Sequence, residues 1–141
     1  MTQAQRLDEI LALHAKREGP LLPILIDVQA AFGCVDAAAE AHLAQALNLS
    51  RAEVHGVVSF YHDFTPAPDP RPCVQLCRAE ACQANGVEAF VAAAEAAAGT
   101  RVHLKTVYCL GLCSVGPNAR VRGQVHARLD QAALIKLVQH A

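Results

Sequence analysis

The chain has 141 residues and a formal net charge of −1 at pH 7; 53% of its residues are hydrophobic and 4% aromatic. This length suits one ordinary domain or two small ones, and the near-zero charge removes the electrostatic case for nucleic acid or an acidic membrane. The polar start MTQAQRLDEI lacks a signal peptide's apolar core, and no window approaches the roughly 20 apolar residues of a membrane span. We therefore expect a cytoplasmic protein whose six cysteines are reduced.

The first part of the chain contains four short helical patterns. Apolar residues at i, i+3, i+4 spacing predict a helix within residues 2–18, and a second pattern ends at Gly33, a typical C-terminal cap. Asp36 is placed to cap a third helix, and Ser50 opens the capping-box sequence SRAE of a fourth. Four short helices with short connections predict a small antiparallel bundle.

A proline-rich stretch marks a change in composition. The sequence TPAPDPRP, residues 65–72, has four prolines in eight positions, which is typical of a semi-rigid extended linker. We place a domain boundary there. The expected organisation is a helical bundle over residues 1–64, the linker, and a second domain over residues 73–141.

The second domain alternates strand and helix patterns. CVQLC directly after the linker predicts a strand, residues 86–98 an alanine-rich helix, and residues 101–108 a second strand. Two further short strands flank a hairpin turn expected at Gly123-Gln124, and Asp130 is placed to cap a last helix. The order βαβββα predicts a sheet with helices packed on it, and the whole chain is expected to be α+β.

Four of the six cysteines stand in two clusters, CRAEAC and CLGLC. Cys77 and Cys82 follow the first predicted strand, and Cys109 and Cys113 follow the second. In a reducing compartment, thiolates suit soft metals such as iron and zinc. Parallel pairing of the two strands would bring both clusters to the same end of the sheet. The sequence therefore predicts one metal centre there.

The two remaining cysteines are expected to be structural. Cys73 and Cys77 are four residues apart, but a strand separates their Cα atoms by about 13 Å, too far for neighbouring ligands of one small cluster. Cys34 follows a helix-ending glycine, and a free cysteine behaves as a small hydrophobe. The expected ligands are Cys77, Cys82, Cys109 and Cys113.

The spacing favours an iron–sulfur centre and leaves zinc open. Structural zinc sites commonly use tight pairs such as C-x2-C, whereas the wider C-x4-C suits a cluster whose two irons spread the sulfur ligands. A thioredoxin-type dithiol needs C-x-x-C, which does not occur. Zinc remains the alternative on spacing alone.

Two further groups of residues raise structural questions. Gly86, Gly111 and Gly116 stand near the cysteines, where a backbone without Cβ atoms can approach a cluster closely; ordinary turn glycines are the alternative. A small aromatic cluster is expected in the core of the bundle, with a role as an interface anchor as the alternative. It consists of Phe60, Tyr61 and Phe64.

CRAEACQANG together with CLGLCSVGP resembles the thioredoxin-like [2Fe–2S] ferredoxins. With LLPILIDVQAAFG and LNLSRAEVHGVVSFYHDF, the chain is similar to the gamma subunits of soluble, NAD-dependent molybdenum formate dehydrogenases, from about Leu21 to Asp130. The resemblance implies a helical bundle followed by a thioredoxin-like domain carrying one [2Fe–2S] cluster on the same four cysteines. It also makes Pro117 a candidate cis-proline.

The chain has neither a G-x-G-x-x-G sequence nor a P-loop, so FMN, NAD and the molybdenum cofactor are expected only on partner subunits. The resemblance implies a non-catalytic electron-transfer subunit of a formate dehydrogenase. Its expected partners are the flavoprotein subunit that binds FMN and NAD, and a larger subunit containing molybdenum and iron–sulfur clusters, with no nucleic acid and no membrane. The equivalent subunit of an NAD-linked hydrogenase or of complex I is one alternative; a zinc-stabilised structural adapter is another.

Overall fold

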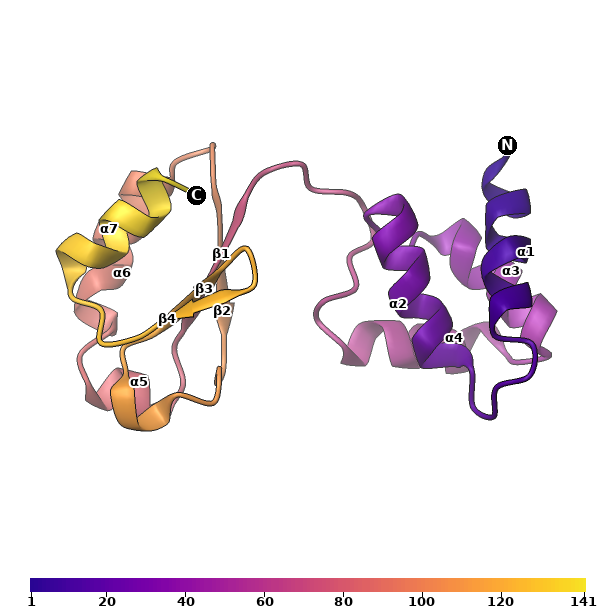
Figure 1. Cartoon of the computed structure of the whole chain (residues 1–141), viewed down its shortest axis with the longest axis horizontal. Coiled ribbons are helices and arrows are strands. Elements are labelled where there is room, and N and C mark those ends of the chain that lie inside the picture. The colour runs from indigo at the N-terminus through magenta and orange to yellow at the C-terminus, as the bar shows by residue number, and fades with distance from the viewer. The chain divides into compact units, whose positions relative to one another are not determined.

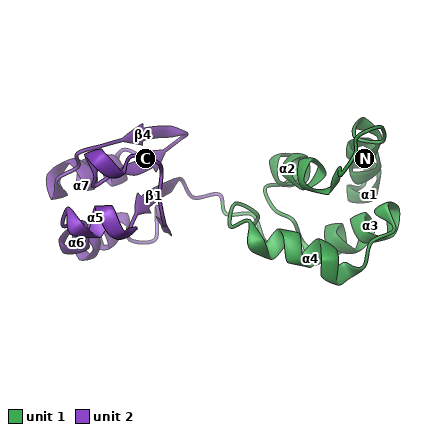
Figure 2. Cartoon of the chain, turned by 90° about the horizontal axis from the view of Figure 1, so that it is seen from below, with its two compact units in different colours: residues 1–69 green, residues 70–141 purple.

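The computed structural model describes all 141 residues and divides into two compact units, residues 1–69 and 70–141 (Figure 2). The first unit is helical, and the second combines three α-helices with a four-stranded sheet (Figure 1). The predicted α+β class is confirmed. None of the helices is both long enough and apolar enough to cross a membrane.

The helical unit consists of four helices, α1 (Gln3–Leu13), α2 (Leu21–Phe32), α3 (Ala37–Leu47) and α4 (Arg51–Phe60). Each helix contributes apolar side chains to a single core. Its buried members are Leu7, Ile10, Ile24, Leu25, Val28, Val35, Ala39, Leu43, Ala44, Val54 and Val58.

Capping residues begin and end three of these helices at the positions that the sequence predicts. The side chains of Asp36 and Ser50 accept hydrogen bonds from the backbone N–H groups of Ala39 and Glu53. The Glu53 carboxylate accepts from the N–H of Ser50, which completes the capping box. Gly33 ends α2 with a φ of 72°, a left-handed conformation that glycine adopts without strain.

The segment predicted as a linker begins with residues that are held to the helical unit. The backbone oxygen of Thr65 accepts from the N–H of Val35 at 2.8 Å. The amide of Gln29 accepts from the Thr65 N–H at 3.0 Å and donates to its hydroxyl at 3.1 Å. These bonds satisfy the backbone of Thr65 in place of regular secondary structure.

The second unit carries the mixed sheet, with strand order β2-β1-β3-β4. Strands β1 and β2 are parallel, and the other neighbours are antiparallel. The elements are, in chain order, β1 (Cys73–Cys77), α5 (Glu80–Ala84), α6 (Glu88–Ala98), β2 (His103–Val107), the 3-10 turn η1 (Cys113–Val115), β3 (Ala119–Val121), β4 (Gln124–His126) and α7 (Gln131–Gln139). This is the predicted order with the short helix α5 and the turn η1 added.

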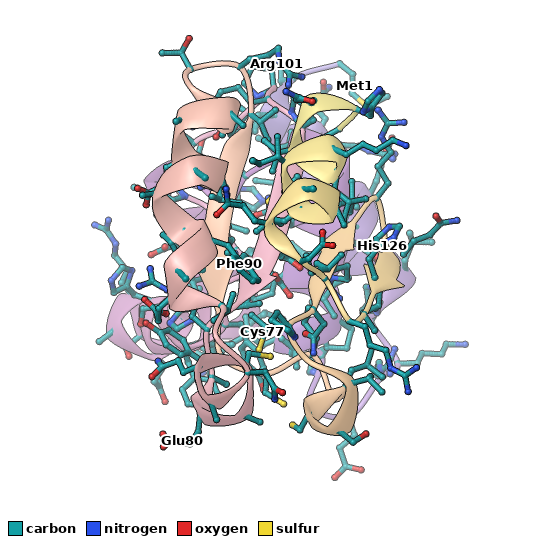
Figure 3. The ribbon with its side chains drawn as sticks, turned by 90° about the vertical axis from the view of Figure 1, so that its left-hand side faces the viewer. Met1, Cys77, Glu80, Phe90, Arg101 and His126 are labelled. Atoms are coloured by element: carbon teal, nitrogen blue, oxygen red, sulfur yellow. The ribbon has the colours of Figure 1, made fainter.

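Helices α6 and α7 lie side by side on one face of the sheet (Figures 1 and 3). The alternation of β1 buries Val74 and Leu76 in the core beneath them. Helix α6 makes the crossover between the two parallel strands, whose register pairs Cys77 with Val107. The C-terminal ends of β1 and β2 therefore lie at the same end of the sheet, as predicted.

The hairpin turn lies one residue earlier than predicted. Arg122 and Gly123 form the turn, with φ values of 49° and 80°. Gln124 already belongs to β4, where it pairs with Val121 of β3. A two-residue turn with both φ angles positive matches the twist of an antiparallel pair.

The prediction that the aromatic cluster lies in the bundle core is wrong for two of its three rings. Phe60 is 75% and Tyr61 41% exposed, and only Phe64 packs against the core. The rings still contact one another edge to face, with centroids 5.1 and 6.1 Å apart. Helix α4 buries the face of Val54 and Val58, so the helical period turns Phe60 outward.

Candidate metal centre

Four cysteines gather at the end of the sheet where β1 and β2 finish. Cys77 is the last residue of β1, and Cys82 lies in the short helix α5 that follows it. Cys109 follows β2, and Cys113 opens η1. Figure 3 shows Cys77 below α6 and α7, near the turn of α5 that begins at Glu80.

The four thiols form two pairs of opposite exposure. Cys77 and Cys82 are 2% and 1% exposed, and we call them the inner pair. Cys109 and Cys113 are exposed, with Sγ atoms 3.6 Å apart, and we call them the outer pair. The Cys82 thiol interacts with those of Cys77 and Cys113, and Cys113 also interacts with Cys77. The electrostatic interaction between Cys82 and Cys113 thus links the inner pair to the outer pair.

Their surroundings shift the thiol pKa values in different directions. Burial, followed by the hydrogen bond with Cys77, raises the pKa of Cys82. The Gly111 N–H donates to the Sγ of Cys109 at 3.3 Å and, together with Cys113, lowers the pKa of Cys109. The hydrogen bond with Cys109 raises the pKa of Cys113. Metals bind the thiolate, so a ligand thiol must lose its proton. Because its pKa is lowered, Cys109 loses its proton more readily than Cys113 does.

Two of the three candidate glycines contribute to the site. A Cβ atom at Gly116 would lie 3.0 Å from the Sγ of Cys82, so a side chain at this position would crowd the inner pair. Gly111, with a φ of 80°, directs its N–H at Cys109. Gly86 is an ordinary turn glycine, because a Cβ atom there would meet nothing within 4 Å.

Asn118 connects the two pairs, and the sequence reasoning missed it. Its backbone N–H donates to the Cys82 thiol, and its backbone oxygen accepts from the N–H of Cys77 at 3.1 Å. Its side-chain Nδ2 donates to the backbone oxygen of Leu112, the residue before Cys113, at 3.0 Å. Asn118 is 1% exposed and is the one buried polar residue of the chain.

The loop that contains Asn118 also contains the predicted cis-proline. The Gly116–Pro117 peptide bond is cis, which confirms the prediction. The backbone oxygen of Pro117 accepts from the N–H of Leu129 at 3.0 Å. No motif in the sequence pointed to Asn118, which follows this proline directly.

The remaining cysteines lie apart from this group. Cys34 is buried in the helical unit, where burial, with a smaller effect of Asp36, raises the pKa of its thiol. Cys73 is half-buried and opens β1, at the opposite end of the strand from Cys77. Within the second unit, Cys73 therefore lies away from the end of the sheet where the two pairs meet.

The donor set fits a [2Fe–2S] cluster. Four thiols lie at one end of the sheet, backbone N–H groups point at two of the sulfurs, and Gly116 leaves room beside the inner pair. Four cysteine thiolates are the usual ligands of such a cluster, and hydrogen bonds to sulfur tune it. No three His, Cys, Asp or Glu side chains in the chain gather closely enough to hold a single metal ion.

The chain is similar to proteins of known families. The family described as thioredoxin-like [2Fe–2S] ferredoxin matches residues 7–141. The chain is 29% identical to a subunit of the NADH-quinone oxidoreductase of Rhizobium meliloti, over 99% of this chain and 88% of that protein. It is 26% identical to the HndA protein of the NADP-reducing hydrogenase of Solidesulfovibrio fructosivorans, over 87% of this chain and 77% of that one.

A solved structure shows the same fold. The chain superposes on a crystal structure of an NAD+-reducing [NiFe]-hydrogenase in its air-oxidized state with a TM-score of 0.66 and 27% sequence identity. The match covers 99% of this chain and 24% of the hydrogenase chain. The chain therefore corresponds to about a quarter of that longer polypeptide.

Proposed function

Because the chain belongs to the thioredoxin-like [2Fe–2S] ferredoxin family, we propose that it is the electron-transfer subunit of an NAD-linked oxidoreductase complex, and specifically of a soluble NAD-dependent formate dehydrogenase. The coarser assignment is supported by relatives that are subunits of NADH-quinone oxidoreductase and NADP-reducing hydrogenase. The finer one is supported by the sequence segments VSFYHDF and CRAEACQ, which resemble the formate dehydrogenase gamma subunits.

The observation that carries this proposal is the single group of four interacting thiols at the end of β1 and β2. We assign these residues as the ligands of one [2Fe–2S] cluster: Cys77, Cys82, Cys109 and Cys113. A bound cluster takes up and releases one electron at a time. Neither Cys34 nor Cys73 has a place in this ligand set.

The chain's residues shape the site in two ways. The inner pair is buried, so protein atoms exclude water from that side, whereas the outer pair lies at the surface, where a partner's redox group can approach. The N–H groups of Gly111 and Asn118 donate to sulfur. Such donors stabilise added negative charge and therefore favour reduction.

The assignment requires partners because the chain has no nucleotide-binding loop. FMN and NAD belong in this proposal to a flavoprotein subunit, and the molybdenum cofactor belongs to a larger subunit that also contains iron–sulfur clusters. The chain itself is non-catalytic and exchanges electrons with the flavoprotein.

The cluster and its ligands are tested on the full chain purified without oxygen. We expect visible absorption of a [2Fe–2S] cluster and, after reduction with dithionite, its EPR signal. The signal should disappear in Cys82→Ser and Cys109→Ser and persist in the control Cys73→Ser. A colourless protein that contains zinc would contradict the proposal and support the structural adapter.

The choice of complex is tested by purifying the tagged chain from its native cells. We expect a co-purifying flavoprotein, molybdenum in the metal analysis, and formate-dependent reduction of NAD. Nickel with hydrogen-dependent activity would assign the chain to a hydrogenase, and quinone reduction without either metal would assign it to complex I. Both results leave the cluster assignment intact and refute the formate dehydrogenase.

A further inference from the structure

We propose that Asn118 is a positioning residue that couples the inner and outer cysteine pairs, and that its side-chain amide serves the geometry of the cluster site rather than the stability of the fold. This inference rests on the proposed function, since it takes the four cysteines as cluster ligands. Asn118 does not bind the cluster in this proposal. It acts through the segments that do.

The orientation of the amide is determined by its partner. Nδ2 of Asn118 lies 3.0 Å from the backbone oxygen of Leu112. A backbone carbonyl only accepts hydrogen bonds, so the amide nitrogen must face it, and exchanging the nitrogen and oxygen would remove the bond. Oδ1 of Asn118 is then buried without a hydrogen-bond partner.

A half-satisfied amide in the core is unfavourable for folding. Burying a polar oxygen without a donor removes its interaction with water and provides no hydrogen bond in exchange. A leucine has nearly the same size and shape and carries no such group. Stability of the core alone therefore does not account for an asparagine at position 118. Its hydrogen bond to the backbone oxygen of Leu112 does.

That hydrogen bond acts on the outer pair. The Leu112 oxygen also accepts from the N–H of Val115 at 3.1 Å, which closes the η1 turn that Cys113 opens. The outer pair is exposed, and the same turn is also held by the N–H of Arg128, which donates to the backbone oxygen of Val115 at 2.7 Å. The Asn118 side chain attaches this turn to the protein interior.

The backbone of the same residue holds the inner pair. Its N–H donates to the Cys82 thiol and its oxygen accepts from the N–H of Cys77. One residue therefore sets the position of each pair relative to the other. Without the side-chain bond, the outer pair loses the hydrogen bond that ties it to the residue holding the inner pair, while the fold keeps its core.

The consequence for the cluster is specific. A less restrained outer pair weakens the directed N–H contact from Gly111 to Cys109, so the reduced cluster, which carries more negative charge, loses stabilisation. We expect a more negative reduction potential in Asn118→Leu. Removal of groups that orient metal ligands typically lowers metal affinity at least tenfold, so we also expect cluster loss to an iron chelator about tenfold faster.

The test compares Asn118→Leu with Asn85→Leu in the full chain. Asn85 is a stringent control, because it also lies beside Gly116 and its Nδ2 also donates to a backbone oxygen, that of Ala81 at 2.7 Å, but it is exposed and this bond stays within α5 and its C-terminal cap. The measurements are the midpoint potential from an EPR-monitored titration, the rate of cluster loss to the chelator, and the melting temperature of the cluster-free protein. Asn118→Leu should change the first two and leave the third unchanged or higher; Asn85→Leu should change neither of the first two.

Two results would overturn the inference. One is a wild-type potential and wild-type cluster lifetime in Asn118→Leu; the other is a lower melting temperature with an unchanged potential, which assigns Asn118 to folding alone. If Asn118→Leu does not fold, Asn118→Ala removes the same bond without filling the space and is judged by the same measurements. Absence of a [2Fe–2S] cluster from the wild-type chain would instead refute the proposed function.

Discussion

Gly116 approaches Cys82 so closely that a Cβ atom on the glycine would lie 3.0 Å from the cysteine sulfur and 3.5 Å from its Cα. The backbone of Gly116 has a φ of −69° and a ψ of 164°, which any residue can adopt. The glycine is therefore favoured by the limited space beside the sulfur and not by the chain conformation.

Replacing this glycine should impair cluster binding. In Gly116→Ala the added methyl group pushes on the inner pair, with strain on the order of 1–3 kcal/mol. We expect less iron per chain and faster cluster loss than in the wild type, measured by iron analysis and visible absorption. Undiminished iron content would show that the site adjusts to the methyl group.

As a control for Gly116→Ala, the same substitution at Gly56 in α4 should stabilise the protein. Gly56 is helical, and a Cβ atom there would meet nothing within 4 Å. Gly56→Ala lowers the conformational entropy of the unfolded chain and should raise the free energy of unfolding by about 0.5–1 kcal/mol. Chemical denaturation followed by circular dichroism measures it. Iron content should stay at the wild-type level, and a loss there would undermine the steric argument for Gly116.

Asp36 should contribute a pH-dependent part of the stability of the helical unit. The N–H of Ala39 and, to a smaller extent, the side chain of Gln3 lower the pKa of its carboxyl below the ordinary value of 3.8. A group with a lowered pKa in the folded state stabilises fully above its unfolded pKa, and the contribution is lost as pH falls through the folded value.

Two substitutions separate the charge of Asp36 from its role as a cap. Asp36→Ala should lower the free energy of unfolding by about 1 kcal/mol at neutral pH. Asp36→Asn keeps an accepting oxygen but cannot titrate, so its stability should depend less on pH below about pH 4. Denaturation curves at several pH values decide this, and equal acid sensitivity of Asp36→Asn and the wild type would contradict it.

The exposure of the aromatic cluster predicts different effects for two apolar residues. Phe60 is 75% exposed, so Phe60→Ser should change the free energy of unfolding by less than about 0.5 kcal/mol. Leu25 is fully buried, and Leu25→Ala should lower it by about 2–5 kcal/mol. Thermal and chemical unfolding of both variants measure the contrast. A large loss of unfolding free energy in Phe60→Ser would show that the Phe60 ring contributes to the core.

The features that the sequence predicted well depend on short-range chemistry. Gly33, Asp36 and Ser50 end or begin helices through contacts within a few residues, so their patterns can be recognised without knowledge of the fold. The strand patterns that precede the two cysteine clusters are equally local. Their parallel pairing follows from the helix between them, since a crossover connection joins parallel strands.

Other features required the tertiary structure because they depend on distant parts of the chain. Whether Phe60 is buried is decided by the direction in which α4 packs, and Arg122 enters the turn because β3 and β4 pair in one register. Asn118 showed no motif, since its three partners belong to segments separated along the chain and meet only when the sheet forms. The sequence alone determined which thiols stand in pairs. Only the packing of β1, β2 and the loop before β3 decided how those pairs are joined, because hydrogen bonds between segments exist only once the segments are brought together.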